Sequence, residues 1–314
     1  MAHKFAHDML LVEGAKLHAV ASRDEKRAKD FATTYKATSA YDSYESLAND
    51  KNVDVVYIAT HHCYHYEHSM LCLKAGRGVI CEKPFAVNSK QVQEMINEAV
   101  KKKLFLMEAM WTRFIPATEK VLEMVKAGVI GDIVEFNADF GFVANPDPER
   151  RLFNRKLGGG SLLDIGIYPV FVSLLLLGEP ESIEASATIA ETGVDSECIV
   201  KLQYNNGVTA SFECSFLTLT PTDATIQGSK GAIYIYPRFH HSEKITANRH
   251  DTEDLDFDIP YVGYGYYHEI LEVVECMRQG LIESPKMTHE NSLQLINTLD
   301  RIREIVGVRY AEDD

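Results

Sequence analysis

Residues 53–84, VDVVYIATHHCYHYEHSMLCLKAGRGVICEKP, decide the fold of the first part of this chain. Residues 53–59 form a nearly continuous apolar run, which is typical of a parallel strand buried on both faces. A helix is expected from about 64 to 74, because Gly76 supplies a glycine just after its end. Residues 78–81 form the next strand. This strand–helix–strand unit predicts a parallel sheet covered by helices.

The same alternation continues on both sides of that unit. Strands are expected at 15–21 and 104–107. Helices are expected at 24–34, capped by Asp24, and up to about 102, capped by Asn88 or Ser89, with a short helical turn at 44–48. Residues 1–110 are therefore predicted to form a doubly wound, Rossmann-type dinucleotide-binding domain.

After residue 110 the pattern changes. A helix at 116–127, a long alternating strand at 133–143 and an apolar helix at 161–177 are followed by consecutive strands at 183–190, 197–204, 208–216, 224–228 and 232–236. Asn206-Gly207 is a hairpin signal between two of these strands. Helices at 265–278 and 289–306 close the chain. Residues 111–314 are predicted to form an α+β domain with an open, mostly antiparallel sheet.

Composition excludes several classes of protein. Of the 314 residues, 46% are hydrophobic and 25% charged, as in ordinary globular proteins. A net charge of −14 argues against nucleic acid as a partner. The longest apolar run, 170–178, is too short for a membrane helix, and the N-terminus has no secretory pattern. Six cysteines without a CxxC pair suit a reducing compartment, so a cytoplasmic location is expected.

Two motifs carry residues suited to chemistry. Glu82-Lys83-Pro84 follows a strand directly, where ligands bind in doubly wound sheets, and the proline restricts the backbone of the lysine. The alternative is a surface lysine before a turn, and the tripeptide alone does not separate the two readings.

The second motif is GGGSLLDIGIYPV, residues 158–170. Its glycines allow close backbone approach, and Ser161 is placed to cap the helix that follows. Asp164 and Tyr168 lie four residues apart, so they share one face of an otherwise apolar helix. Buried polar groups are costly unless satisfied or used. A structural hydrogen-bonded pair is the alternative to a catalytic one.

Together with MEAMWTRF at 107–114, these motifs resemble the glucose–fructose oxidoreductase/inositol dehydrogenase/MocA (Gfo/Idh/MocA) family. The Trp-Thr-Arg-Phe segment and Tyr168 resemble its dimeric dihydrodiol dehydrogenase branch. The resemblance spans essentially the whole chain. It implies an NAD(P)-dependent oxidoreductase that transfers a hydride between nicotinamide and a secondary alcohol or hemiacetal carbon of a polyol, sugar or trans-dihydrodiol. It also implies that residues 111–314 bind substrate and form a homodimer or homotetramer through the open sheet.

By this resemblance the catalytic residues are Lys83, Tyr168 and Asp164. Lys83 lies beside the nicotinamide ribose and the substrate hydroxyl, Tyr168 is the acid/base and Asp164 orients the substrate or tunes the pair. The chemistry is consistent, because a neighbouring ammonium favours the phenolate of a phenol whose pKa is normally near 10. Trp111, Arg113 and Phe140 are the expected substrate pocket; core packing at a domain junction is their alternative role.

The expected cofactor is NADP, with NAD possible. A strand that ends at Ser22-Arg23 suits a 2′-phosphate, whereas NAD enzymes usually carry an acid there. The cofactor-binding residues are expected to be Ser22, Arg23, Thr60, His61, His65, Glu82 and Lys83.

Four histidines, at positions 61, 62, 65 and 68, have spacings that could suggest a metal site. A site needs at least three convergent ligands with supporting partners, and no cysteine or carboxylate completes this set. No metal is expected.

One part of the dinucleotide-binding pattern is missing. The chain has neither the first strand nor the G-x-G-x-x-G turn, and residues 2–6 fit the helix that should follow that turn. A gap between two sheet strands and weaker dinucleotide binding are expected. The hypothesis is that the natural protein starts about a dozen residues upstream, roughly one strand with its turn. Two other readings are a dinucleotide-sensing regulator on the same fold and a truncated, cofactor-free remnant.

Overall fold

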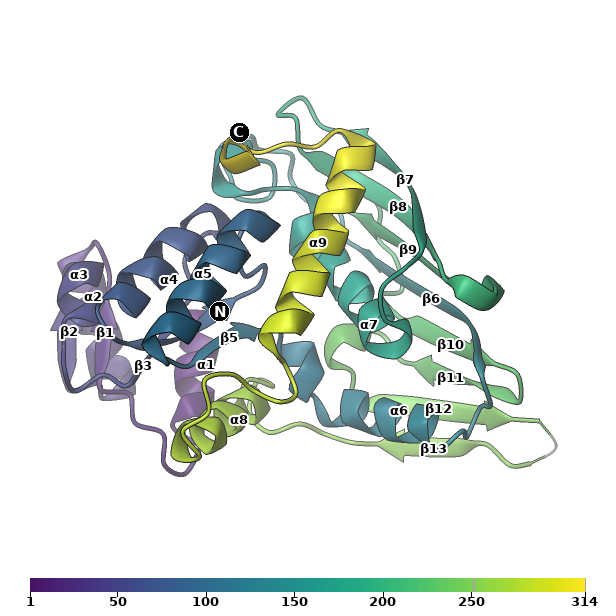
Figure 1. Cartoon of the computed structure of the whole chain (residues 1–314), viewed down its shortest axis with the longest axis horizontal. Helices are drawn as coiled ribbons and strands as arrows, with labels where there is room; N and C mark the ends of the chain where they lie inside the picture. Colours follow the sequence, from purple (N-terminus) through teal and green to yellow (C-terminus); the bar gives the residue numbers. More distant parts are fainter. Residues whose placement is uncertain (251, 314) are drawn as a thin grey trace. The chain divides into compact units, whose positions relative to one another are not determined.

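The computed structural model describes residues 1–250 and 252–313 and divides into two compact units (Figure 1). Unit 1 comprises Met1–Trp111 and Tyr261–Leu293, and unit 2 comprises Thr112–Pro260 and Gln294–Asp314. Residues 261–293 therefore group with the N-terminal unit, whereas the sequence predicted a continuous second domain from residue 111. The reason is local: buried Asp8 accepts hydrogen bonds from the backbone N–H groups of Tyr264, Tyr266 and Tyr267.

The parallel strands of unit 1 form two separate sheets. Strands β1 (Ala19–Ala21) and β2 (Ser39–Tyr41) make one parallel pair. Strands β3 (Val55–Ile58), β4 (Gly78–Glu82) and β5 (Leu106–Ala109) make the second sheet, in that order. The predicted Rossmann-type fold is confirmed. Within the part of the chain that the structure describes, the predicted gap lies between the β1–β2 pair and β3.

Helices fill the connections in unit 1. They are α1 (Ala2–Met9), α2 (Glu25–Tyr35), α3 (Tyr44–Ala48), α4 (His65–Lys74), α5 (Ser89–Lys102) and, from later in the chain, α8 (Tyr267–Arg278). Asp24 caps α2 by accepting the Arg27 N–H, as predicted. Of the two predicted caps for α5, Asn88 is the one used, since its side chain accepts the Gln91 N–H.

Unit 2 is built on an eight-stranded sheet in the order β13-β12-β11-β10-β6-β9-β8-β7. Its strands are β6 (Ile133–Gly141), β7 (Ser182–Ile189), β8 (Asp195–Gln203), β9 (Thr209–Ser215), β10 (Ala224–Gly228), β11 (Gly231–Ile235), β12 (Lys244–Arg249) and β13 (Leu255–Asp258). Only the β6–β9 pair is parallel among these neighbours. The open, mostly antiparallel sheet is confirmed.

Two strands of this sheet lie outside the sequence prediction. β12 (KITANR) and β13 (LDFD) are short and lack a long apolar alternation, so their pairing with the sheet determines their structure. The hairpin between β8 and β9 is present, and its turn, Asn205–Gly207, is a single 3₁₀ turn with Gly207 at φ +82°.

One face of the sheet is covered and the other is open. Val200, Phe212 and Cys214 are buried on the covered face, whereas Ile199, the neighbour of Val200, is 52% exposed. Helices α6 (Pro116–Lys126) and α7 (Ile167–Leu177) contact the sheet, and α9 (His289–Val306) closes the chain. The alternation of side chains along each strand produces this division.

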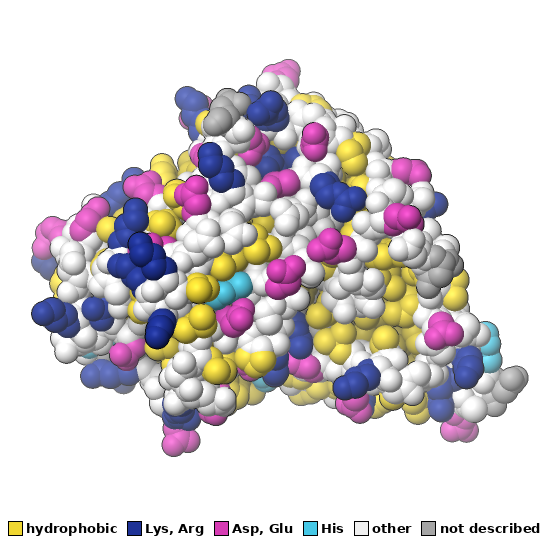
Figure 2. All heavy atoms as spheres, viewed as in Figure 1, with side chains coloured by type: hydrophobic (Ala, Val, Ile, Leu, Met, Phe, Trp, Pro, Cys, Tyr) yellow, Lys and Arg dark blue, Asp and Glu magenta, His cyan; other side chains and the backbone are white. Residues whose placement is uncertain are grey.

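The segment Arg155–Leu177 is long and apolar enough to pass for a membrane span, with a mean hydropathy of 1.9, but 78% of its window is buried inside the structure. Figure 2 shows hydrophobic side chains gathered on the visible face of unit 2 where Figure 1 labels α7. The last turn of α7, residues 174–177, is partly exposed there. The segment thus has the burial of a core helix.

Candidate active site

In unit 1 the candidate residues follow three neighbouring strand ends. Ile58 pairs with Cys81 and Glu82 pairs with Ala109, so β3, β4 and β5 end side by side. Thr60 follows β3, Lys83 follows β4 and Trp111 follows β5. Parallel strands therefore bring these three predicted residues to one edge of the sheet, where doubly wound proteins bind ligands.

Lys83 is only 5% exposed and precedes a cis peptide bond to Pro84. The next N–H, that of Phe85, donates to the Glu108 carboxylate of β5 at 3.0 Å. Burial raises the pKa of Glu108 to about 7, and the nearby positive charge of Lys83 opposes that rise. The backbone that follows Lys83 is thus held to strand β5 beside a buried carboxyl group.

His65 connects the turns that follow β3 and β4. Its Nδ1 lies 2.7 Å from the Pro84 carbonyl oxygen and its Nε2 lies 3.1 Å from the Thr60 carbonyl oxygen. Burial lowers the pKa of His65 to about 4, so the ring is neutral at pH 7 and donates to one of the two carbonyls. The structure therefore places this predicted cofactor residue against the protein backbone on both ring nitrogens.

Glu82 is also buried and accepts a hydrogen bond from the Tyr57 hydroxyl. Burial raises the pKa of Glu82, and the Tyr57 hydrogen bond and the Lys83 charge oppose that rise. Phe5 of α1 stacks on Tyr57, with ring centroids 3.5 Å apart. Glu82 is thus held by a packed aromatic cluster within unit 1.

Arg23 is exposed at the end of β1, and its guanidinium lies over the ring of Tyr64, 5.9 Å from the centroid. Ser22 accepts a hydrogen bond from the Asp24 N–H at 3.2 Å. His61, also exposed, precedes the 3₁₀ turn His62–Tyr64. An arginine stacked on an aromatic ring keeps its donors available for an anion.

The glycine run in unit 2 leads into an irregular helix start. Leu162–Gly166 is a π-helical stretch, and regular α-helix begins only at Ile167. The predicted cap at Ser161 is wrong: its hydroxyl makes no cap bond and instead donates to Asp195 at 2.7 Å. The π stretch contains Asp164, which agrees with the tendency of such stretches to occur at functional sites.

Tyr168 lies in a group of three neighbouring rings within unit 2. Its ring centroid is 4.6 Å from that of His240 and 5.9 Å from that of Phe140, and the rings of Phe140 and His240 are 4.5 Å apart. The Thr112 hydroxyl donates to the His240 carbonyl oxygen at 2.7 Å. The structure thus brings predicted Phe140 and Tyr168 together and adds His240.

Two predicted residues of unit 2 make ion pairs. Asp164, 7% exposed, accepts a 2.6 Å hydrogen bond from the guanidinium of Arg151, and Arg113 pairs with Glu119 at 2.9 Å. The Arg151 side chain is 40% exposed. The bond to Arg151 accounts for a carboxylate on an apolar helix.

Sequence reasoning missed His240, Arg151 and Glu108. Glu108 lies within the MEAMWTRF motif, so that stretch carried a signal for it. His240 and Arg151 contact the Tyr168 segment only through folding, and nothing in their local sequences indicates it.

Among residues 1–250 and 252–313, no group of three or more His, Cys, Asp or Glu side chains is arranged to hold a metal ion. Both ring nitrogens of His65 lie within 3.1 Å of a backbone carbonyl oxygen, and the Nδ1 of His68 lies 3.1 Å from the Thr60 hydroxyl oxygen. These two histidines therefore have structural roles in this region.

The donor chemistry at the strand ends of unit 1 fits a nicotinamide dinucleotide. An exposed arginine and a serine follow β1, a threonine hydroxyl follows β3 and an ammonium follows β4. Helix α1 also begins without a side-chain cap, so its first N–H groups are not taken by a side chain. Fold and site together define an NAD(P)-binding oxidoreductase.

Comparison with known proteins agrees. Residues 1–110 match the oxidoreductase family with an NAD-binding Rossmann fold, and residues 118–234 match the GFO/IDH/MocA C-terminal domain. The chain is 40% identical over 305 residues to trans-1,2-dihydrobenzene-1,2-diol dehydrogenases of Mus musculus and Homo sapiens, covering 94% of this chain and 90% of each relative. It belongs to the Gfo/Idh/MocA family, and the similarity to dihydrodiol dehydrogenases is confirmed.

Solved structures share the whole fold. A 3-ketoreductase from Actinomadura kijaniata, in complex with TDP-benzene and NADP, has a TM-score of 0.82 at 25% identity, covering 96% of this chain and 92% of that one. An aldose–aldose oxidoreductase from Caulobacter crescentus has a TM-score of 0.87 at 22% identity, covering 96% and 93%. The second likeness establishes fold alone.

Proposed function

We propose that this chain is an NADP-preferring dehydrogenase or reductase acting on a secondary alcohol or hemiacetal carbon of a polyol, sugar or trans-dihydrodiol. The observation that carries the proposal is Lys83, which is buried at the carboxyl end of β4, where the following backbone is held by the Phe85–Glu108 hydrogen bond. The names of the dihydrodiol dehydrogenase relatives and the NADP in the 3-ketoreductase structure support the reaction class.

In this proposal Lys83 and Tyr168 handle the hydroxyl proton of the substrate. Bound NADP supplies the hydride acceptor or, as NADPH, the hydride donor. In oxidation the Tyr168 phenolate accepts the proton of the substrate hydroxyl, and in reduction the phenol returns it. By the resemblance to the family, the Lys83 ammonium favours the phenolate form. Asp164, paired with Arg151, positions the polar groups of the substrate.

Each unit carries its own cluster of aromatic rings. Phe140 and His240 stack beside Tyr168 in unit 2, and Trp111 stacks on Tyr266 in unit 1 with centroids 5.0 Å apart. Flat or ring-shaped substrates bind well to such surfaces. Arg113 contributes charge to the pocket.

The first test uses Trp111, the single tryptophan of the chain. NADPH is expected to quench Trp111 fluorescence saturably and more tightly than NADH, because Trp111 follows the strand next to that of Lys83. Turnover is then assayed with trans-dihydrodiols, aldoses and polyols. Quenching without turnover of any of them would favour a dinucleotide-sensing regulator. No quenching in a folded chain would contradict cofactor binding.

Arg23 tests the NADP preference. Arg23→Ala is expected to raise the Kd of NADPH about 10-fold or more, since a charge-assisted bond to phosphate is worth roughly 1.5–3 kcal/mol. The Kd of NADH should change by less than about 2-fold, because NADH lacks the 2′-phosphate.

Lys26→Ala, at an exposed position of α2, is the matched charge control. Calorimetric titration of both nucleotides measures the effect. Equal weakening of NADPH and NADH by Arg23→Ala would overturn the preference.

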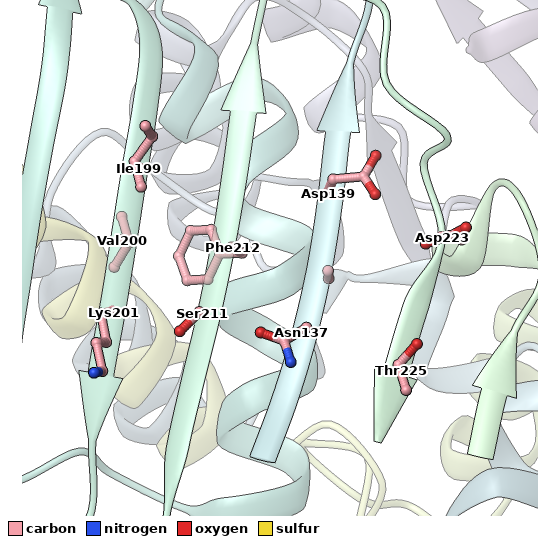
Figure 3. A pocket seen from close by; sticks show the side chains of 10 residues that line it. Asn137, Asp139, Ile199, Val200, Lys201, Ser211, Phe212, Asp223 and Thr225 are labelled. Carbon is pink, nitrogen blue, oxygen red and sulfur yellow. The ribbon is translucent and has the colours of Figure 1, made fainter. Parts of the chain in front are cut away.

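We also propose a cytoplasmic homodimer or homotetramer assembled through the open sheet face. Figure 3 shows this face, with side chains of Asn137, Asp139, Lys201, Ser211 and Thr225 around a shallow depression of about 430 Å³. Exposed Ile199 supplies an apolar centre beside them. A chain that sediments as a monomer would contradict this assembly.

A further inference from the structure

The segment that carries Asp164 and Tyr168 starts with a turn that cannot satisfy its own backbone. The first N–H groups of any helix lack partners within the helix, and here the π stretch Leu162–Gly166 follows directly on the glycine run. The Ser161 side chain does not cap this start. A group from elsewhere in the fold must therefore accept these donors.

Asp195, the first residue of β8, supplies that acceptor. It is completely buried, and its Oδ2 accepts hydrogen bonds from the Leu162 N–H at 2.6 Å and from the Ser161 hydroxyl at 2.7 Å. Negative charge at a helix N-terminus is favourable. Asp195 thus fixes the position of Leu162, two residues before Asp164 and six before Tyr168.

The surroundings leave this carboxylate little freedom. A Cβ on Gly160, which has φ +128°, would lie 2.5 Å from Asp195 Oδ1. The Tyr310 hydroxyl donates to the Gly159 carbonyl oxygen at 2.5 Å from the far end of the chain. On the sheet side, a Cβ on Gly166 would lie 2.7 Å from the Cys214 sulfur. Residues 159–166 are therefore closely packed on each of these sides, which leaves Asp195 next to the start of the helix.

Burial raises the pKa of Asp195 to about 6, so it is ionised at pH 7. The titratable groups that face it are Tyr310 and Cys214, and burial raises the pKa of each above its usual value, which keeps both neutral at that pH. Asp195 is therefore the group that carries the negative charge beside the Ser161 and Leu162 donors.

We propose that Asp195 is a positioning residue, which orients the Tyr168 segment for proton transfer by accepting the Ser161 and Leu162 donors. The inference rests on the proposed function. Asp195 holds the start of the segment that carries Tyr168, and the rings of His240 and Phe140 contact the Tyr168 ring at the end of that segment. It should therefore affect kcat more than KM or cofactor affinity.

A double-mutant cycle tests the proposal. Asp195→Ala removes the oxygen that accepts both bonds and is expected to lower kcat about 10- to 100-fold, with KM and the Kd of NADPH within about 3-fold of wild type. Asp195→Asn keeps an oxygen that can accept both bonds and should retain most of the activity. Tyr168→Phe combined with Asp195→Ala should be no slower than Tyr168→Phe alone, since both changes act on one step. If the two losses multiply, or if kcat is unchanged, the proposal is overturned.

Two further variants guard against a general folding effect. Ser161→Ala removes only one of the two donors and should lower kcat about 3- to 10-fold in the wild-type background but not in Tyr168→Phe. Ser173→Ala, which removes a buried hydroxyl bonded to the Pro169 carbonyl oxygen later in the same helix, is the control and should leave kcat unchanged. An equal loss in Ser173→Ala would overturn the assignment to Asp195.

Amide hydrogen exchange separates this proposal from the proposed function. Asp195→Ala should speed exchange selectively at residues 162–168, whether or not the chain turns over a substrate. If exchange is faster but the chain has no activity, the Asp195 contact is supported and the proposed enzymatic function is contradicted. Unchanged exchange at these residues would refute the contact.

Discussion

Replacing Lys83 with methionine is expected to lower kcat/KM by about 10³-fold, within the range of 10²–10⁴ typical of a lost proton-transfer group. Methionine keeps most of the apolar stem in a site where Lys83 is 5% exposed, so packing is largely preserved while the ammonium is lost. Steady-state oxidation of the best diol or polyol, monitored as NADPH absorbance, measures the change.

Lys101→Met in α5 is the matched control, because Lys101 is exposed near the helix end. It should retain full activity. Removing the Lys83 ammonium should also raise the pKa values of Glu82 and Glu108, since its charge lowers both. Near-normal turnover by Lys83→Met would remove this lysine from the mechanism.

Tyr168→Phe is expected to lower kcat by about 10²- to 10³-fold with little change in KM. Only the hydroxyl is lost, and the ring contacts with His240 and Phe140 are retained. The pH–rate profile should also lose the limb that belongs to the phenol. Pre-steady-state hydride transfer with NADPH and a carbonyl substrate separates this loss from product release.

Tyr234→Phe provides the comparison within unit 2, because it removes from strand β11 a hydroxyl that donates to the Asp223 carboxylate. It should leave kcat unaffected. A Tyr168→Phe variant with wild-type kcat would instead assign the proton to another group, with His240 the first to test.

The sequence predicted the elements whose signals are local. Continuous apolar runs marked β3 and β4, and Asp24 marked the start of α2. The strands β12 and β13 escaped prediction because their conformation depends on pairing with β11 and with each other. Propensity cannot reveal such non-local pairing.

The candidate site follows the same rule. Lys83 and Tyr168 lie in motifs that can be read along the chain, whereas Arg151 and Asp195 reach the 161–168 segment only in the folded protein. Ser161 shows the limit clearly: its spacing suits a helix cap, but a buried carboxylate from a distant strand takes its hydroxyl. Sequence therefore identified the candidate reactive groups and missed the groups that contact them in the fold.

The neutral ring of His65 has a thermodynamic consequence for unit 1. Because the pKa of His65 falls from 6.5 to about 4 on folding, folding releases a proton from His65 between those pH values. The free energy of unfolding therefore decreases as the pH falls through this range. Glu108 does the opposite, because its pKa rises from 4.5 to about 7, so its ionisation lowers stability as pH rises. Between about pH 4.5 and 6.5 one proton is taken up as another is released, and the two linkages largely cancel.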